Sequence, residues 1–323
     1  MPAAERLRAW ALAVLPIVAV AAVGWWANGA VTRTMEERVA DRLQQMLAGF
    51  ESGFKGITAE QQSLVRWIAA EPRVRRELLA LARGERADTA ALLRLLTPVL
   101  GSHGIENFAL ADTTGRILAS SERGLVGTVT AQYDEKAVGR LRAGEAVTRP
   151  PFAAPDVDAA GRPTGGTHPA ALTAVGVFDE RDRFVGWFDV RVEPSVEYTP
   201  LLDGARSGAT GEVLLVDSAG TLLTRSRFED ELRRTGLLVR DPSATSALAV
   251  RLRDPGGDLL AGHQPSTPAD AWPLSSGARR AVAGTPGVDV QGYRSYLGRE
   301  VVGAWRWYPQ AGIGLLAEQG VEE

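Results

Sequence analysis

The residues of this sequence best suited to chemistry are three side chains at alternate positions, Trp187, Asp189 and Arg191. Alternate side chains of an extended strand point to the same side, so these three would share one face. An arginine binds a carboxylate through paired hydrogen bonds, and an aspartate holds an ammonium or a hydroxyl group. The pattern therefore indicates a site for a small polar molecule. The alternative is a surface ion pair between Asp189 and Arg191, worth about 0–1 kcal/mol.

Neighbouring segments carry further residues that could cover this face. His168 enters the preceding predicted strand, Tyr133 lies upstream, and Arg149 and Phe152 flank two prolines. Small-molecule sites are concave and largely apolar, with a few well-placed polar groups. We therefore predict a ligand site made by seven residues: Tyr133, Arg149, Phe152, His168, Trp187, Asp189 and Arg191.

Other kinds of chemistry have little support in the sequence. The chain has no cysteine, which excludes disulfides, thiol catalysis and Cys-ligated metals. Its three histidines, His103, His168 and His263, lie far apart, and no metal, nucleotide or nucleophile-elbow motif occurs. The net charge of −3 argues against a nucleic-acid partner. We predict a non-enzymatic protein with no cofactor and no metal.

A hairpin pattern occurs twice, at 108–121 and 213–226. Each copy has an apolar run, an Asp-x-x-Gly turn (beginning at Asp112 or Asp217) and a second apolar run. Aspartate suits the first position of a type I turn, and glycine suits the fourth. A second match pairs the segment around Gly186 with that around Gly303. Two matches in the same order predict one module used twice.

Strands and loops follow from alternation and from turn residues. In the first half we expect a loop at 156–169 and strands at 171–178 and 184–192; a linker helix at 194–207 follows. The second half should close with strands at 288–296, 301–308 and 313–318. Within 184–192, period two places Phe184 with Phe188 on the core face and Val185 with Trp187 on the other. Antiparallel sheets with segregated helices make an α+β chain.

The N-terminus carries an uncharged stretch of 19 residues, Ala9 to Ala27. At about 1.5 Å per residue it nearly spans a hydrocarbon core of about 30 Å. Trp10, Trp25 and Trp26 sit where interfacial aromatics belong. We predict a tail at 1–8 and a transmembrane anchor at 9–28, with residues 9–27 in the membrane; a cleaved signal peptide is the rival interpretation.

Residues 29–102 are predicted to form a long helical stalk. Apolar residues from Met35 to Ile68 mostly follow a three-four spacing, which gives one stripe. Glycines at 49, 53 and 56 favour a bend, Pro72 should start a new helix, and Pro98 should end the helical region. The stripe fits either a homodimer through the stalk or a helix packed on its own sheet, and both interpretations stay open.

These elements together resemble a double Cache sensor domain, the PAS-like extracytoplasmic region of bacterial chemoreceptors, sensor kinases and nucleotide cyclases. The resemblance rests on the two Asp-x-x-Gly hairpins, the Gly186 and Gly303 strands and the ending at 312–319. It implies an α+β chain in which an N-terminal transmembrane helix and a long stalk helix precede two PAS-like antiparallel-sheet modules in tandem. The membrane-distal module, 103–200, would hold the ligand, and the module at 205–323 would lie near the membrane. It also implies a place in the inner membrane with the bulk periplasmic or extracellular.

The sequence departs from this family in two places. The amino-acid-binding subset carries an Arg-x-Trp-Tyr cluster, whereas 124–150 has Tyr133, Arg140 and Arg142 but no tryptophan. The run 305–308 (Trp-Arg-Trp-Tyr) lies in the last strands, where packing is the expected role, so amino-acid specificity is not transferred. The chain also ends where the family begins a second span, which predicts either a piece of a longer receptor or signalling through a partner.

Two functions from different classes are therefore compared. The first is a membrane-anchored input domain of a bacterial signalling receptor, which binds a small molecule in the first module and relays the change through the long helix. The alternative is an anchored structural or interaction module without a small ligand.

Overall fold

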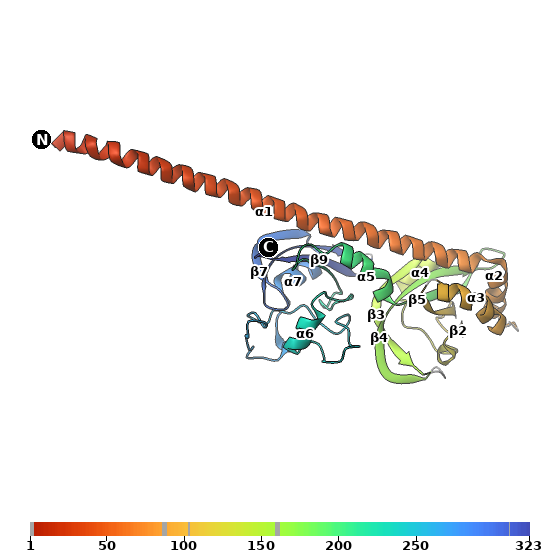
Figure 1. Cartoon of the computed structure of the whole chain (residues 1–323). Coiled ribbons are helices and arrows are strands. Elements are labelled where there is room, and N and C mark those ends of the chain that lie inside the picture. Colours follow the sequence, from red (N-terminus) through yellow and green to blue (C-terminus); the bar gives the residue numbers. More distant parts are fainter. Residues whose placement is uncertain (1–2, 86–88, 103, 159–161, 310) are drawn as a thin grey trace.

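The computed structural model describes residues 3–85, 89–102, 104–158, 162–309 and 311–323, with the side chains of the first helix from Val23 onward (Figure 1). Its elements are, in chain order, α1 (Ala3–Ala70), α2 (Pro72–Ala82), α3 (Thr89–Ser102), β1 (Ile105–Asp112), β2 (Ile117–Ser120), η1 (Arg123–Leu125), α4 (Glu135–Arg142), β3 (Val147–Val157), β4 (Pro163–Phe178), β5 (Phe184–Val192), α5 (Pro194–Gly204), β6 (Glu212–Val216), α6 (Glu229–Thr235), η2 (Ala269–Ala271), α7 (Ser276–Val282), β7 (Gly287–Arg294), β8 (Glu300–Tyr308) and β9 (Ile313–Gly320).

Helix α1 runs without a break from Ala3 to Ala70, so its glycines do not interrupt the helix. Gly53 instead allows a close approach, because a Cβ there would lie 2.2 Å from Leu201 of α5. The predicted break before Pro72 is confirmed: the Glu71 carboxylate accepts a hydrogen bond from the Val74 amide at 2.8 Å and caps α2. Pro98 lies inside α3, and the helical region ends four residues later at Ser102, close to the predicted end near Gly101.

Among the residues that the structure describes, none of the helices combines the length and the apolar character that a membrane crossing requires. The anchor predicted at 9–28 falls mostly on residues 1–22, whose side chains lie outside the described part of the chain.

The first sheet has five antiparallel strands in the order β2-β1-β5-β4-β3. Strands β3 and β4 extend the pairing as far as Val157 and Pro163, so most of the segment predicted as a loop at 156–169 is a long hairpin. Strand β3 was not predicted because this strand contains Pro150, Pro151 and Pro155. Prolines are tolerated there because β3 is an edge strand, with one side free of ladder hydrogen bonds.

A bulge in β5 corrects the predicted faces of its first residues. Val177 pairs with Gly186, but Phe178 pairs with Phe184, so β5 carries an extra residue between these pairs. The extra residue shifts the alternation by one position. Phe184 therefore packs beside Trp187, and Val185 packs into the core with Phe188, the reverse of the prediction.

The second sheet has four antiparallel strands in the order β6-β9-β8-β7. This order matches β1-β5-β4-β3 of the first sheet strand for strand. The predicted closing strands are confirmed within two residues. The match of Gly186 with Gly303 is wrong, because Gly186 lies in β5 and Gly303 in β8, which occupy different places in the two orders.

The two Asp-x-x-Gly turns have the same hydrogen bonds, as predicted. The Asp112 carboxylate accepts from the Thr114 and Arg116 amides, and Gly115 donates its amide proton to the Asp112 carbonyl. Asp217 accepts from the amides two and four residues later in the same way. Both turns therefore follow from local chemistry, although the returning arm of the second forms only isolated bridges.

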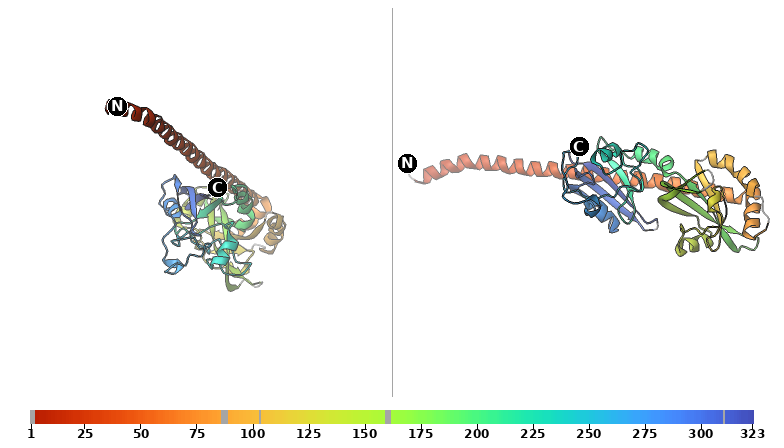
Figure 2. Two further views of the ribbon diagram at one scale, coloured as in Figure 1. Left: turned by 60° about the vertical axis from the view of Figure 1, so that its left-hand side comes forward. Right: turned by 90° about the horizontal axis from the view of Figure 1, so that it is seen from below.

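The apolar stripe of α1 packs against both sheets of its own chain. Leu43, Leu47 and Phe50 are buried against the second sheet and α5, whereas Val65 and Ile68 are buried against the first sheet. Figures 1 and 2 show α1 passing along both sheets, while its N-terminal part projects beyond them. The stripe is thus a core surface of this chain from about residue 39 onward.

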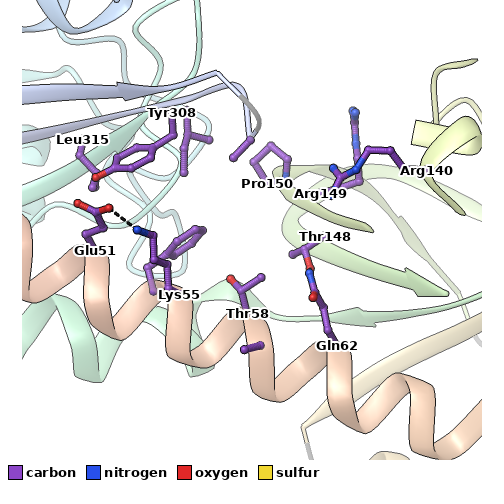
Figure 3. A pocket seen from close by; sticks show the side chains of 14 residues that line it. Glu51, Lys55, Thr58, Gln62, Arg140, Thr148, Arg149, Pro150, Tyr308 and Leu315 are labelled. Carbon is purple, nitrogen blue, oxygen red and sulfur yellow. Dashed lines mark hydrogen bonds and ion pairs between the residues drawn. The ribbon is translucent and has the colours of Figure 1, made fainter. Parts of the chain in front are cut away.

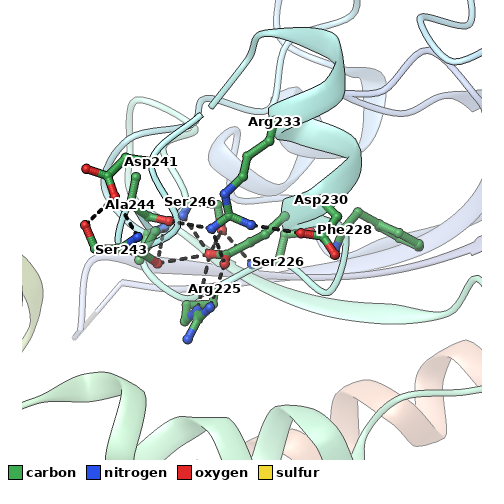
Figure 4. A network of polar contacts seen from close by, with 12 residues as sticks. Arg225, Ser226, Phe228, Asp230, Arg233, Asp241, Ser243, Ala244 and Ser246 are labelled. Carbon is green, nitrogen blue, oxygen red and sulfur yellow. Dashed lines mark hydrogen bonds and ion pairs between the residues drawn. The ribbon is translucent and has the colours of Figure 1, made fainter. Parts of the chain in front are cut away.

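A buried carboxylate fixes the irregular segment after β6. Glu229, 6% exposed, pairs with Arg225 at 2.6 Å and Arg233 at 3.3 Å and accepts from the Ser246 amide at 2.8 Å (Figure 4). Burial opposes ionisation, but Arg225 and Ser246 outweigh it and lower the pKa of Glu229 to about 2. This network holds α6 against the loop that carries Ser246.

We expect the Gly186→Ala substitution to lower the free energy of unfolding by about 3 kcal/mol. A Cβ at residue 186, where φ is +151°, would lie 2.1 Å from the Ala111 carbonyl oxygen. Gly144, at φ +81°, is the matched control: a Cβ there would meet no atom within 4 Å, and alanine should cost about 1 kcal/mol. Urea unfolding of the full chain measures both, and equal losses would contradict the close approach of β5 and β1.

Candidate ligand site on the first sheet

Asp189 lies in the middle of β5, on the face turned away from α1. Its partners across the sheet are Ala109 on β1 and Ala174 on β4. Neither methyl group can pair with a carboxylate, yet the Asp189 residue is only 6% exposed. The sheet therefore presents a buried acid between two small side chains.

Tyr133 and Trp187 stand beside this acid. Their ring centroids are 5.5 Å apart at an interplanar angle of 67°, and both residues are buried. Tyr133 is placed by helix α4, which begins where the Asp134 carboxylate accepts from the Ala137 amide and which packs Leu141 onto the same sheet face. The sequence predicted Tyr133, Trp187 and Asp189 for one site, and the structure places them together.

The electrostatics of this cluster are those of an acid without a counter-charge. Asp189 forms no ion pair with any cationic side chain in the described part of the chain. Burial raises the pKa of Asp189 to about 7, and the nearby Tyr133 and Trp187 offset only part of that effect. Burial and then the Asp189 charge raise the pKa of Tyr133 well above its usual value.

Within the described part of the chain, the polar atoms of the two rings have no partner other than Asp189. The Tyr133 hydroxyl and Trp187 Nε1 are buried beside the Asp189 carboxylate and form no hydrogen bond of good geometry with another described residue. Buried polar groups in native proteins are nearly always paired, so each exception calls for an explanation. A ligand with its own donors and acceptors would satisfy these groups.

Arg191 and His168 belong to an adjoining ion-pair network. Arg191 pairs with Glu106 at 3.2 Å and with Glu122, and it does not pair with Asp189. His168 contacts Glu106 at 3.5 Å and Asp156 at 2.6 Å. Glu106 therefore links the two predicted residues. No sequence signal pointed to these carboxylates, because their positions depend on which strands pair.

The last two predicted residues lie on the edge strand. Phe152 is partly buried against the cluster that contains Tyr133 and Trp187. Arg149 lies on the same strand, but its side chain lines a cavity between the two sheets. The structure thus gathers Tyr133, Trp187 and Asp189, with Phe152 and Arg149 at the margin. Among the described residues, no three acidic or histidine side chains come together in a way that could hold a metal ion.

No protein-family model matches the chain, and no curated protein sequence is significantly similar to it. Solved structures do share its fold. The sensor domain of the Vibrio cholerae histidine kinase DctB has a TM-score of 0.51 at 13% identity, over 88% of this chain and 98% of that one. A methyl-accepting chemotaxis protein X has a TM-score of 0.52 at 13% identity, over 89% and 99%. The ligand-binding domain of the Campylobacter jejuni chemoreceptor Tlp3, in complex with 4-methylisoleucine, has a TM-score of 0.51 at 12% identity, over 89% and 92%.

These similarities define the fold as that of the sensor domains of histidine kinases and chemoreceptors. This agrees with the double Cache resemblance found in the sequence. The similar structures are sensor and receptor domains, and none of those named here is an enzyme's catalytic domain.

We expect Asp189→Asn to reduce the loss of stability that wild type undergoes as pH rises. The folded pKa of about 7 exceeds the ordinary 3.8, so the stabilising contribution is complete below about pH 4 and disappears as pH rises through 7. Between pH 4 and pH 8, wild type should therefore lose on the order of 4 kcal/mol of unfolding free energy that Asp189→Asn does not lose, since one pKa unit is about 1.4 kcal/mol. Unfolding of both proteins at pH 4 to 8 measures it.

The control is Asp112→Asn, because hydrogen bonds from Thr114 and Arg116 outweigh burial and lower the pKa of that turn carboxylate. That variant should lose stability at neutral pH. Parallel pH profiles for wild type and Asp189→Asn would show that Asp189 is not the buried acid described above.

Proposed function

We propose that this chain is the ligand-sensing input domain of a bacterial signalling receptor, anchored in the inner membrane by residues 9–27 with its sheets outside the cytoplasm. The observation that carries the proposal is the buried Asp189 carboxylate, which lies beside Tyr133 and Trp187 and has no cationic partner among the described residues. The fold shared with sensor domains of kinases and chemoreceptors supports it. A purely structural face would be expected to carry apolar side chains there.

The chemistry of the face favours a ligand with an ammonium group. A cation at Asp189 would supply the missing counter-charge, and the rings of Tyr133 and Trp187 would form an aromatic wall beside it. One structure of the same fold holds 4-methylisoleucine, an amino acid with such a group. Arg149, Phe152, His168 and Arg191 border the face and would shape the rest of the site.

The proposed relay is helix α1. This helix packs on the first sheet near Val65 and on the second sheet near Leu43, which lies closer to the anchor. A ligand that binds one arrangement of the first sheet better than another would shift the equilibrium between them. The helix would carry that shift past the second, membrane-proximal sheet. In this proposal the two sheets belong to the tandem PAS-like modules of residues 103–200 and 205–323.

We expect compounds with an ammonium group to raise the melting temperature of the full chain in a screen of amines, amino acids, organic acids, purines and sugars. A ligand at about 100 times its Kd adds about 2.7 kcal/mol. Because Asp189 is mostly protonated at pH 6, binding of a cation there should release close to one proton. Calorimetry in two buffers of different ionisation enthalpy measures this release.

The Asp189→Asn variant should bind no such compound, whereas Asp203→Asn, at an exposed carboxylate, should bind as wild type does. Hits that survive in Asp189→Asn would place the ligand elsewhere. A folded chain that no compound stabilises would favour the anchored interaction module.

A homodimer through the stalk remains part of the proposal, but the stripe from Leu43 to Ile68 faces the chain's own sheets. Contact between copies would then involve the projecting part of α1, where Val31 and Met35 are 53% and 62% exposed. We expect a single cysteine at residue 35 to form a disulfide between copies in membranes, an experiment simplified by the absence of native cysteine. A cysteine at Asp230, whose side chain is 92% exposed, is the control and should not crosslink. Absence of a crosslink through Met35→Cys would count against the dimer.

A further inference from the structure

A cavity of about 280 Å³ lies between the two sheets, against α1 (Figure 3). Helix α1 forms one side with Thr58, β3 forms a second with Arg149 and Pro150, and the second sheet forms a third with Tyr308 and Leu315. Figure 3 shows side chains of the three elements around this space, with the Tyr308 ring turned toward Glu51 and Arg149 on the opposite side. Its volume is slightly below the roughly 300–1,000 Å³ usual for small-molecule sites, which suits a small ligand.

The charges around this cavity are predominantly positive. Glu51 forms ion pairs with both Lys55, at 2.5 Å, and Arg306, at 2.9 Å, so these three residues together carry one excess positive charge. Arg140 on the opposite side has its own partner, Glu145, at 2.7 Å. Arg149 has no ion-pair partner among the described residues, so the cavity contains an uncompensated guanidinium group.

Two buried polar atoms that line the cavity have no hydrogen-bond partner among the described residues. They are Thr58 Oγ1 on α1 and Arg149 Nε on β3, whereas the Tyr308 hydroxyl interacts with Glu51 and Arg306. An unsatisfied buried polar group costs about 1–3 kcal/mol. A guanidinium group and a hydroxyl can both donate hydrogen bonds, and a carboxylate accepts several hydrogen bonds at once. The remaining lining, which includes Phe54 and Leu315, is apolar.

We propose that this cavity is a second ligand site, for a small organic carboxylate with an apolar or aromatic body. The carboxylate lies at Arg149, and the body packs against the apolar part of the lining, which includes Phe54 and Leu315. The site does not use Asp189 and goes beyond the sensor function proposed above. A molecule bound there contacts α1 and both sheets together, so it stabilises one placement of the sheets along the helix.

The test uses benzoate as the probe, with benzyl alcohol and benzylamine as neutral and cationic probes of the same size. Binding to the full chain in mild detergent is followed by calorimetry and by ligand-observed NMR. Benzoate is expected to bind saturably at one site, and the other two probes at least tenfold more weakly. Arg149→Gln should weaken benzoate binding at least tenfold, whereas Arg123→Gln, an exposed arginine outside the cavity, should leave it unchanged.

A second variant tests the location without removing a charge. Ala59 lines the cavity from an exposed position on α1, so Ala59→Phe should fill the space and abolish benzoate binding. Glu60→Phe, at the next and equally exposed position, is the matched control. Thermal unfolding confirms that each variant is folded.

The proposal is overturned if benzoate does not bind, if benzyl alcohol binds as well as benzoate, or if folded Arg149→Gln and Ala59→Phe retain wild-type affinity. Benzoate binding that Asp189→Asn abolishes and Ala59→Phe leaves intact would assign the probe to the first sheet, which overturns this proposal and leaves the sensor proposal standing. Loss of ammonium-ligand binding in Asp189→Asn with benzoate binding retained supports two separate sites.

Discussion

The packing of one helical stripe against two sheets is the contact on which the rest of this structure depends. Each sheet buries one face partly against α1, while α2 and α3 complete the cover of the first sheet and α5 that of the second. Buried apolar area contributes about 25 cal/mol per Å², so residues such as Phe50 and Ile68 hold the sheets to the helix and fix the distance between them. The cavity at Arg149 exists because the two contact regions leave the middle of α1 less fully covered.

Much of this architecture could be predicted because its signals are local. The Asp-x-x-Gly turns, the helix start at Pro72 and the alternation in the closing strands each depend on neighbouring residues alone. Strand β3 was missed since its prolines argue against a strand unless the strand is known to lie at an edge. The reversed faces of Phe184 and Val185 have a similar origin, because a bulge is a property of two paired strands.

In the candidate site, too, the features that depend on neighbouring residues could be predicted, and those that depend on strand pairing could not. Alternation was enough to put Trp187 and Asp189 on one face, and the cover by Tyr133 was predicted from its place in the chain. The partners of Arg191 could not be found, because Glu106 and Glu122 reach it only through the pairing of β1 with β5 and the turn after β2. The small neighbours Ala109 and Ala174, which leave Asp189 without a polar partner across the strands, also cannot be identified until the register is known.

The part of α1 before Val39 also has a mechanical consequence. At about 1.5 Å per residue, the 36 residues from Ala3 to Arg38 make an arm of about 54 Å with no sheet beside most of its length. A tilt of about 5° where the helix meets the second sheet would displace the far end of such an arm by about 5 Å, close to one helical turn. A rearrangement too small to change any strand pairing would thus move the N-terminal end of the helix by several ångströms, because the length of the arm amplifies the tilt.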